Sequence, residues 1–191
     1  MIRAELSKLL SLPATWVTLG WTLAVNVLLT FVIAVGGSAV AYSQAGFVVL
    51  GALATCSEYT GGQIRTTLTV MPRRVHQLTA KYIALVALTV PAALVVALSG
   101  TVITMAVLGS WAVPWEVAEV TAYVTLVTLL GAAVGALVRH TLAAVALVIG
   151  YLFVVTPLVQ DTVFAGDVVT LAFWTPAFLG IALFVHRLRD A

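Results

Sequence analysis

Long stretches without charge are the feature of this sequence that most constrains its fold. No Asp, Glu, Lys or Arg occurs at positions 9–57, and none occurs at positions 82–115. Over 191 residues the chain is 62% hydrophobic and 8% charged, whereas a soluble domain is usually about 25% charged. A chain of this composition has too little polar surface to remain in water, so the sequence predicts an integral membrane protein.

The apolar runs are unbroken, whereas transmembrane β-strands alternate apolar and polar residues. Only helices and closed barrels satisfy the backbone inside lipid, so we expect an all-α polytopic protein. The simplest organisation is one domain over residues 1–191 with six transmembrane helices. Pro91 predicts a tilt or kink in the third span, and Pro176 predicts an interruption of the sixth. The expected spans lie near 16–36, 42–57, 80–107, 120–138, 141–159 and 168–185.

Residues 1–13 form a short amphipathic segment. Ile2, Leu6, Leu9 and Leu10 recur at helical spacing, which predicts a helix lying in the membrane interface. The alternative is a solvated N-terminal tail that ends at Pro13.

The basic residues predict the orientation of the chain. If both termini are cytoplasmic, all nine Lys and Arg residues lie on the inner side, within 1–13, 58–81, the 139–140 turn and the C-terminal tail. The outer loops, of which 108–119 is one, then contain only acidic charges, at Glu116, Glu119, Asp161 and Asp167. This distribution follows the positive-inside rule and predicts a multi-pass protein of the cell membrane.

The sequence contains no phosphate-binding loop, no His-Glu-x-x-His and no Gly-x-Ser-x-Gly. We therefore expect no catalytic residue, cofactor or metal site in this chain, and a small buried apolar role for Cys56. No carboxylate lies within a predicted span, which disfavours an ion-coupled mechanism. For Asn26 we also expect a role in helix–helix packing, in which its side chain holds two helices together. The deepest polar side chains, which are candidates to line a substrate path, are Asn26, Gln44, Tyr123 and Tyr151.

The segment 58–79 is the one long polar interval of the chain. Gly61-Gly62 ends the second span, and Ile64, Leu68 and Met71 then recur at the spacing of a short amphipathic helix that Pro72 ends. An apolar stripe edged by arginine favours docking into a groove of a soluble partner. The alternative is a solvated loop whose charges only set the orientation. Lys81 follows at the base of the third span, where its side chain can snorkel.

This loop resembles the first cytoplasmic loop of type-2 ABC exporter permeases, and the actinobacterial-type subgroup is the most similar. The resemblance is carried by Glu58-Tyr59, Gly61-Gly62, Arg65, Pro72-Arg73-Arg74 and Lys81. The opening Ala4–Leu9 with Thr15-Trp16, and the turn Arg139-His140-Thr141, are similar too. The outer loops are shorter than in that family, and no re-entrant segment follows the fifth span.

The resemblance implies a permease with six transmembrane helices, paired with a second copy or a paralogue. Two separate ATP-binding subunits would bind ATP and Mg and would contact the N-terminal helix and the first cytoplasmic loop. Nucleic acid is not an expected partner. Alternatives are a non-transporting membrane subunit of a larger complex, an ion-coupled carrier and an intramembrane enzyme. The residues expected to couple to the ATPase are Glu58, Gly62, Ile64, Arg65, Leu68, Met71, Pro72, Arg73 and Arg74.

Overall fold

The computed structural model describes residues 2–33, 40–60, 74–109, 114–156 and 168–188. Within these ranges all regular secondary structure is helical, which confirms the all-α prediction. The elements are α1 (Ile2–Ser11), α2 (Pro13–Ile33), α3 (Val40–Thr60), α5 (Arg74–Leu108), α6 (Pro114–Val138), α7 (Thr141–Gly150), the π-helix η1 (Tyr151–Val155) and α9 (Val168–Leu188).

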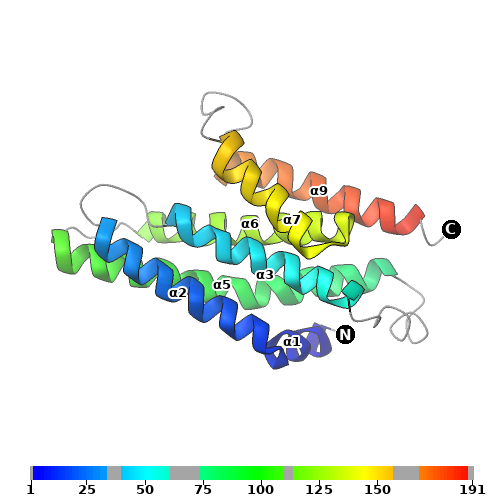
Figure 1. Cartoon of the computed structure of the whole chain (residues 1–191), viewed down its shortest axis with the longest axis horizontal. Coiled ribbons are helices and arrows are strands. Elements are labelled where there is room, and N and C mark those ends of the chain that lie inside the picture. Colours follow the sequence, from blue (N-terminus) through cyan, green and yellow to red (C-terminus); the bar gives the residue numbers. More distant parts are fainter. Residues whose placement is uncertain (1, 34–39, 61–73, 110–113, 157–167, 189–191) are drawn as a thin grey trace.

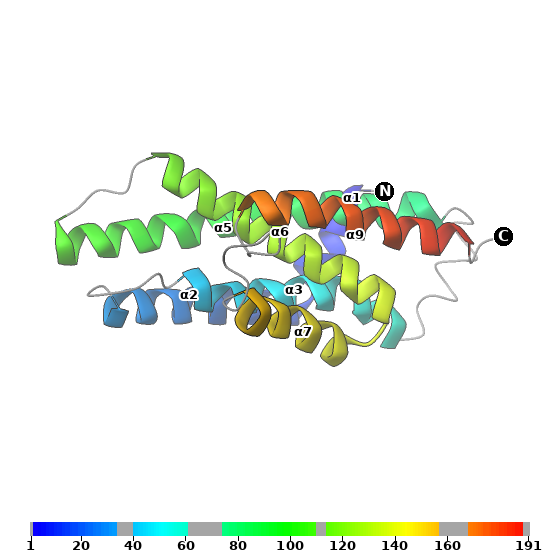
Figure 2. The ribbon, with the colours of Figure 1, turned by 90° about the horizontal axis from the view of Figure 1, so that it is seen from above.

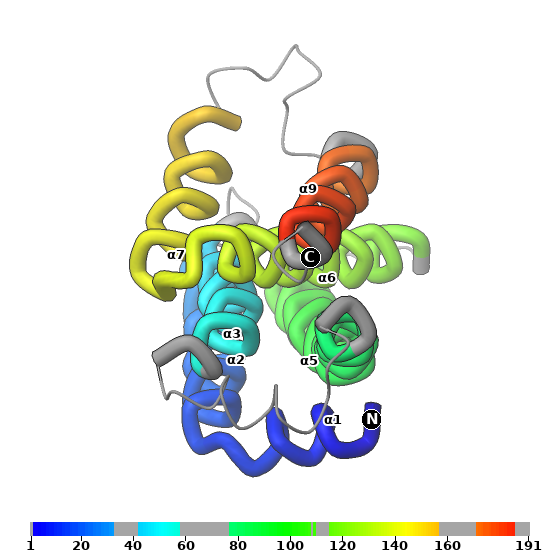
Figure 3. The backbone as a smooth tube through the Cα atoms, turned by 90° about the vertical axis from the view of Figure 1, so that its right-hand side faces the viewer, coloured from blue at the N-terminus to red at the C-terminus, as the bar shows by residue number. Residues whose placement is uncertain are grey.

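The helices form an elongated bundle in which successive long helices run in opposite directions (Figure 1). α6 is the central helix, because it contacts α3, α5, α7 and α9. Viewed along the bundle, α2, α3 and α5 lie on one side of α6, and α7 and α9 lie on the other (Figure 3). α1 lies across the end of the bundle beside the first turns of α5.

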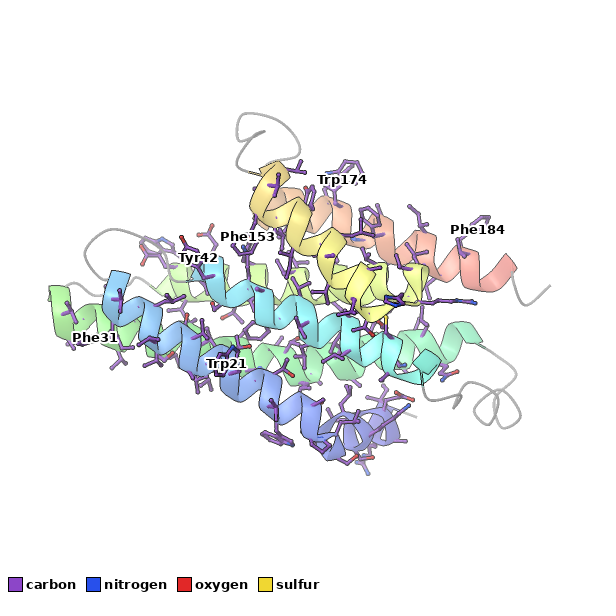
Figure 4. The ribbon with its side chains drawn as sticks, in the orientation of Figure 1. Trp21, Phe31, Tyr42, Phe153, Trp174 and Phe184 are labelled. Atoms are coloured by element: carbon purple, nitrogen blue, oxygen red, sulfur yellow. The ribbon has the colours of Figure 1, made fainter. Side chains whose placement is uncertain are left out.

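Three of the described helical segments are long and apolar enough to cross a membrane, namely Pro13–Val32, Gln77–Val107 and Trp115–Val138. Thr141–Val155 and Leu171–Val185 are shorter apolar helices. Large aromatic side chains project away from the bundle, as Figure 4 shows for Phe184, which is 61% exposed. Exposed apolar surface of this kind suits a lipid environment. The chain is therefore a helical membrane protein, while the count of six spans stays a prediction.

Two features of the helices differ from the sequence predictions. α9 continues through Pro176, where an interruption is predicted. α5 runs for 35 residues and contains Pro91, and the tilt or kink there stays a prediction. Membrane helices tolerate proline where neighbouring groups satisfy the freed carbonyl. α6 begins at Pro114, so Glu116 and Glu119 lie in a helix rather than in the expected loop. Proline suits the first helical position, and acidic side chains near a helix N-terminus stabilise it.

The predicted tight turn between α6 and α7 is confirmed. Arg139 adopts a left-handed backbone conformation with φ of 58°. His140 then caps α7, because its Nδ1 accepts a hydrogen bond from the Ala143 N–H over 3.3 Å. The fifth predicted span is not a regular helix throughout, since α7 passes into the π-helix η1 at Tyr151.

Glycines bring α3 and α6 into close contact. A Cβ placed on Gly131 would lie 2.9 Å from the Val48 carbonyl oxygen, and a Cβ on Gly135 would lie 3.4 Å from the Ala52 Cα. Cys56 is fully buried at the same interface and donates a hydrogen bond to the Gly135 carbonyl over 3.3 Å, as expected for a small buried residue. Small residues of this kind let membrane helices pack backbone against backbone.

Candidate functional site: an apolar groove and the basic end of the bundle

The alternating helices bring the basic segments to one end of the bundle. The ends of α3 and α9, the start of α5 and the α6–α7 turn all lie at this end, as Figure 2 shows at its right-hand side. Lys81 and Arg139 belong to these segments and Arg3 lies in α1, whereas Glu116 and Glu119 lie in the first turns of α6 at the opposite end. The described basic residues and the acidic residues of α6 are therefore separated along the length of the bundle.

α1 is held at the basic end by apolar packing. Leu9 is 4% exposed and belongs to a buried cluster with Ala54 of α3 and Leu78 and Leu85 of α5. Lys81, which the sequence predicted to snorkel, is instead buried at 3% exposure. Lys81 lies close enough to Cys56 of α3 for an electrostatic interaction, so packing inside the bundle removes it from solvent.

Most of the predicted coupling residues lie outside the described residues. These are Gly62, Ile64, Arg65, Leu68, Met71, Pro72 and Arg73. Glu58 lies in the last turn of α3, and Arg74 begins α5. Both flanks of the 61–73 segment are therefore at the basic end. Since Leu78 shares an apolar cluster with Leu9 and α1 contacts α5, the α5 flank lies beside α1.

The four predicted path residues lie at three different helix interfaces. Asn26 is 1% exposed, and its Nδ2 donates to the Val96 carbonyl and to the Ser99 Oγ, each over 3.2 Å, which joins α2 to α5. The Tyr123 hydroxyl donates a hydrogen bond to Gln44 Oε1, which joins α6 to α3. Tyr151 lines a separate groove. The structure thus brings together only Gln44 and Tyr123 of this set.

Most described threonines inside the bundle donate their hydroxyl hydrogen to a backbone carbonyl of their own helix. Thr30 donates to the Asn26 carbonyl over 2.7 Å, and Thr128 donates to the Val124 carbonyl over 2.8 Å. Such hydroxyls do not form a continuous polar path between helices. Within the described ranges, no three His, Cys, Asp or Glu side chains are grouped to hold a metal ion.

Replacing Asn26 with alanine tests whether this residue serves packing or transport. We expect a loss of about 0.6–1.7 kcal/mol of stability, because membrane hydrogen bonds between helices contribute in that range. Thermal unfolding in detergent measures this loss. If the chain carries a substrate, its activity per folded molecule should stay unchanged, and a selective loss of that activity at full stability would instead place Asn26 in the predicted path.

An apolar groove of about 410 Å³ lies between α6, α7, η1 and α9. α6 contributes Leu130, Val134 and Val138, and the opposite wall includes Trp174 of α9 (Figure 4). Tyr151 stands where α7 becomes η1. A volume of this size falls within the range of small-molecule sites, which are mostly apolar with few polar groups.

The π-helix forms part of this groove and was not predicted. The backbone N–H of Thr156 donates to the Tyr151 carbonyl, which is the i→i+5 hydrogen bond of a π-turn. The Thr156 hydroxyl donates to the same carbonyl over 3.2 Å. π-helical turns are rare and occur frequently at functional sites. The nearby sequence signal is Thr156-Pro157, because proline lacks the N–H that a regular helix would use.

The fold and this site define a class, which is a helical membrane protein with an apolar groove beside a basic end. In comparisons with known proteins, no family model, no curated protein and no solved structure matches the chain.

Proposed function

We propose that the chain is the transmembrane permease subunit of an ATP-driven ABC exporter. In this proposal it crosses the cell membrane six times with both termini cytoplasmic, pairs with a second permease and binds a separate ATP-binding subunit. The observation that carries the proposal is the packing of Leu9 of α1 against Leu78 of α5 at the basic end. It places α1 beside the α5 flank of the 61–73 segment. The N-terminal helix and this segment are the elements that the sequence resemblance assigns to the ATPase contact.

The helix contacts offer a route from the ATPase to the groove. The 61–73 segment is continuous with the end of α3 and the start of α5, and both helices pack against α6. α6 in turn forms one wall of the groove with Leu130 and Val134. Closure of the ATP-binding subunits would thus move α3 and α5 against α6 and change the width of the groove. Interfaces of this kind transmit motion because packed helices shift as rigid bodies.

The test is co-purification of the chain with the ATPase encoded in a neighbouring reading frame. Arg65→Glu and Arg73→Glu each reverse a charge in the expected contact, and like charges across an interface cost several kcal/mol. We expect each variant to retain at most about one tenth of the ATPase while membrane insertion is unchanged. Arg139→Glu is the matched control, because it reverses a charge at the same end on a turn outside the expected contact.

Unchanged ATPase binding by both loop variants would contradict the docking role. A topology reporter that placed residue 70 outside the cell would contradict the orientation. If the purified chain moved cargo without nucleotide, the ion-coupled alternative would replace the exporter. Co-purification with other membrane proteins and no cargo movement would favour the non-transporting subunit.

A further inference from the structure

The apolar groove ends directly beside the basic α6–α7 turn. Val138 lines the groove, and Arg139 is the next residue in the chain. Arg139 and His140 are both exposed. An apolar surface therefore passes within one residue into a pair of hydrogen-bond donors at the basic end of the bundle.

His140 presents a donor at this turn. Its Nδ1 accepts the Ala143 N–H, so the proton of the neutral ring is on Nε2. The Arg139 guanidinium carries five N–H donors and a permanent positive charge. The described basic residues in the segments at this end include Arg3, Lys8, Arg74, Lys81 and Arg139, against the acidic residues Glu5 and Glu58, so its net charge is positive. Glu116 and Glu119 lie at the other end of α6, because Glu119 precedes Arg139 by twenty residues, or about 30 Å along the helix. This end of the bundle therefore attracts an anion.

The shape of the groove suits a chain rather than a compact molecule. From Leu130 to Val138 it follows α6 over about 12 Å. Its rim is open to the side, because Leu147 is 59% exposed and Val138 is 37% exposed. In a membrane helix such a rim faces hydrocarbon, and the basic end faces the headgroups.

We propose that the groove binds one acyl chain of an anionic phospholipid, whose headgroup accepts hydrogen bonds from Arg139 and His140. The apolar lining takes the chain, and the basic turn selects the charge of the headgroup. The site rests on the proposed function only for assigning the headgroup to the cytoplasmic leaflet. The lipid is then a candidate for the cargo of the exporter.

Trp174 in the groove wall reports on occupancy. The full chain is reconstituted in phosphatidylcholine vesicles that contain a minor fraction of a lipid with brominated acyl chains, which quench nearby indoles. The difference between the wild type and Trp174→Phe isolates the Trp174 signal. We expect brominated phosphatidylglycerol to quench this signal about five-fold more effectively than brominated phosphatidylcholine, since one basic residue near a membrane has an effect of that size.

Arg139→Gln should abolish the preference for the anionic lipid, and Arg139→Lys should retain most of it. Arg3→Gln is the matched control, because it removes an equal exposed charge at the same end but away from the groove. Equal loss in Arg3→Gln and Arg139→Gln would overturn the proposal in favour of a diffuse surface charge. Equal quenching by both brominated lipids would overturn the role of the headgroup.

Absence of quenching by either lipid would show that protein, such as a second copy of the chain, covers the groove, and it would overturn the proposal. The measurement uses no ATPase. A chain that prefers anionic lipid but binds no ATPase would therefore contradict the exporter and leave the lipid site standing. A chain that binds the ATPase but shows no preference for anionic lipid would contradict the lipid site and leave the exporter standing.

Discussion

Replacing Gly51 with alanine is expected to lower the free energy of unfolding by about 3 kcal/mol. A Cβ at this position would collide with the Thr128 carbonyl oxygen and would lie 3.0 Å from the Ala132 backbone nitrogen. Both atoms belong to the backbone of α6, so no side chain can rotate to make room. The new methyl group must separate α3 from α6, and α6 is the helix that the rest of the bundle surrounds.

The matched control is Gly180→Ala in α9, where an added Cβ would meet no atom within 4 Å. There alanine should be neutral or slightly stabilising, because it favours the helix over glycine by about 0.5–1 kcal/mol. Both variants are heated in detergent, and the monodisperse fraction is measured by size-exclusion chromatography. On the scale of soluble proteins of this size, Gly51→Ala should lower the midpoint by about 6–12 °C. Equal midpoints for the two variants would contradict the backbone contact of α3 with α6.

Replacing Leu9 with aspartate is expected to release α1 from the bundle. Burial of a leucine side chain contributes about 1.5–3 kcal/mol, and a carboxylate in the same apolar cluster adds a desolvation cost. The docked population of α1 should therefore fall at least about tenfold. In a Cys56→Ala, Leu78→Cys background, a membrane-impermeant maleimide should label position 78 faster by a similar factor. ATPase association should fall with it if the proposed function holds.

Ser7→Asp provides the control for this experiment, because it adds the same charge to the exposed side of α1. It should leave the labelling rate at position 78 unchanged. If Leu9→Asp also left the rate unchanged, the packing of α1 against α5 would be refuted. If labelling rose but ATPase binding stayed the same, α1 would be docked on the bundle without contributing to the ATPase contact.

The positions of the helices could be predicted from the sequence because lipid exposure requires long apolar runs. α3 covers the predicted span 42–57, and α9 covers the predicted span 168–185. The gathering of basic segments at one end also follows from the sequence, since charged residues are excluded from hydrocarbon. The buried role of Cys56 was predicted from its residue type and the apolar residues around it.

The pairing of the long helices could not be predicted, because they are apolar on nearly every side. Nothing in the pattern showed that Gln44 would meet Tyr123 or that Asn26 would meet Ser99, since these contacts depend on rotation of each helix about its own axis. The burial of Lys81 depends on how the other helices pack around α5, and not on local sequence. The groove beside Tyr151 depends on a π-turn, which has no reliable sequence signature.

The length of α5 has a mechanical consequence. A helix of 35 residues is about 50 Å long, and the hydrocarbon core of a bilayer is about 30 Å thick. α5 thus behaves as a rod that reaches through both headgroup layers or lies at a slant. Pivoting such a rod by about 5° at one end sweeps the other end through about 4 Å. A small push beneath the membrane therefore becomes a displacement of atomic dimensions at the opposite surface, without any change inside the helix.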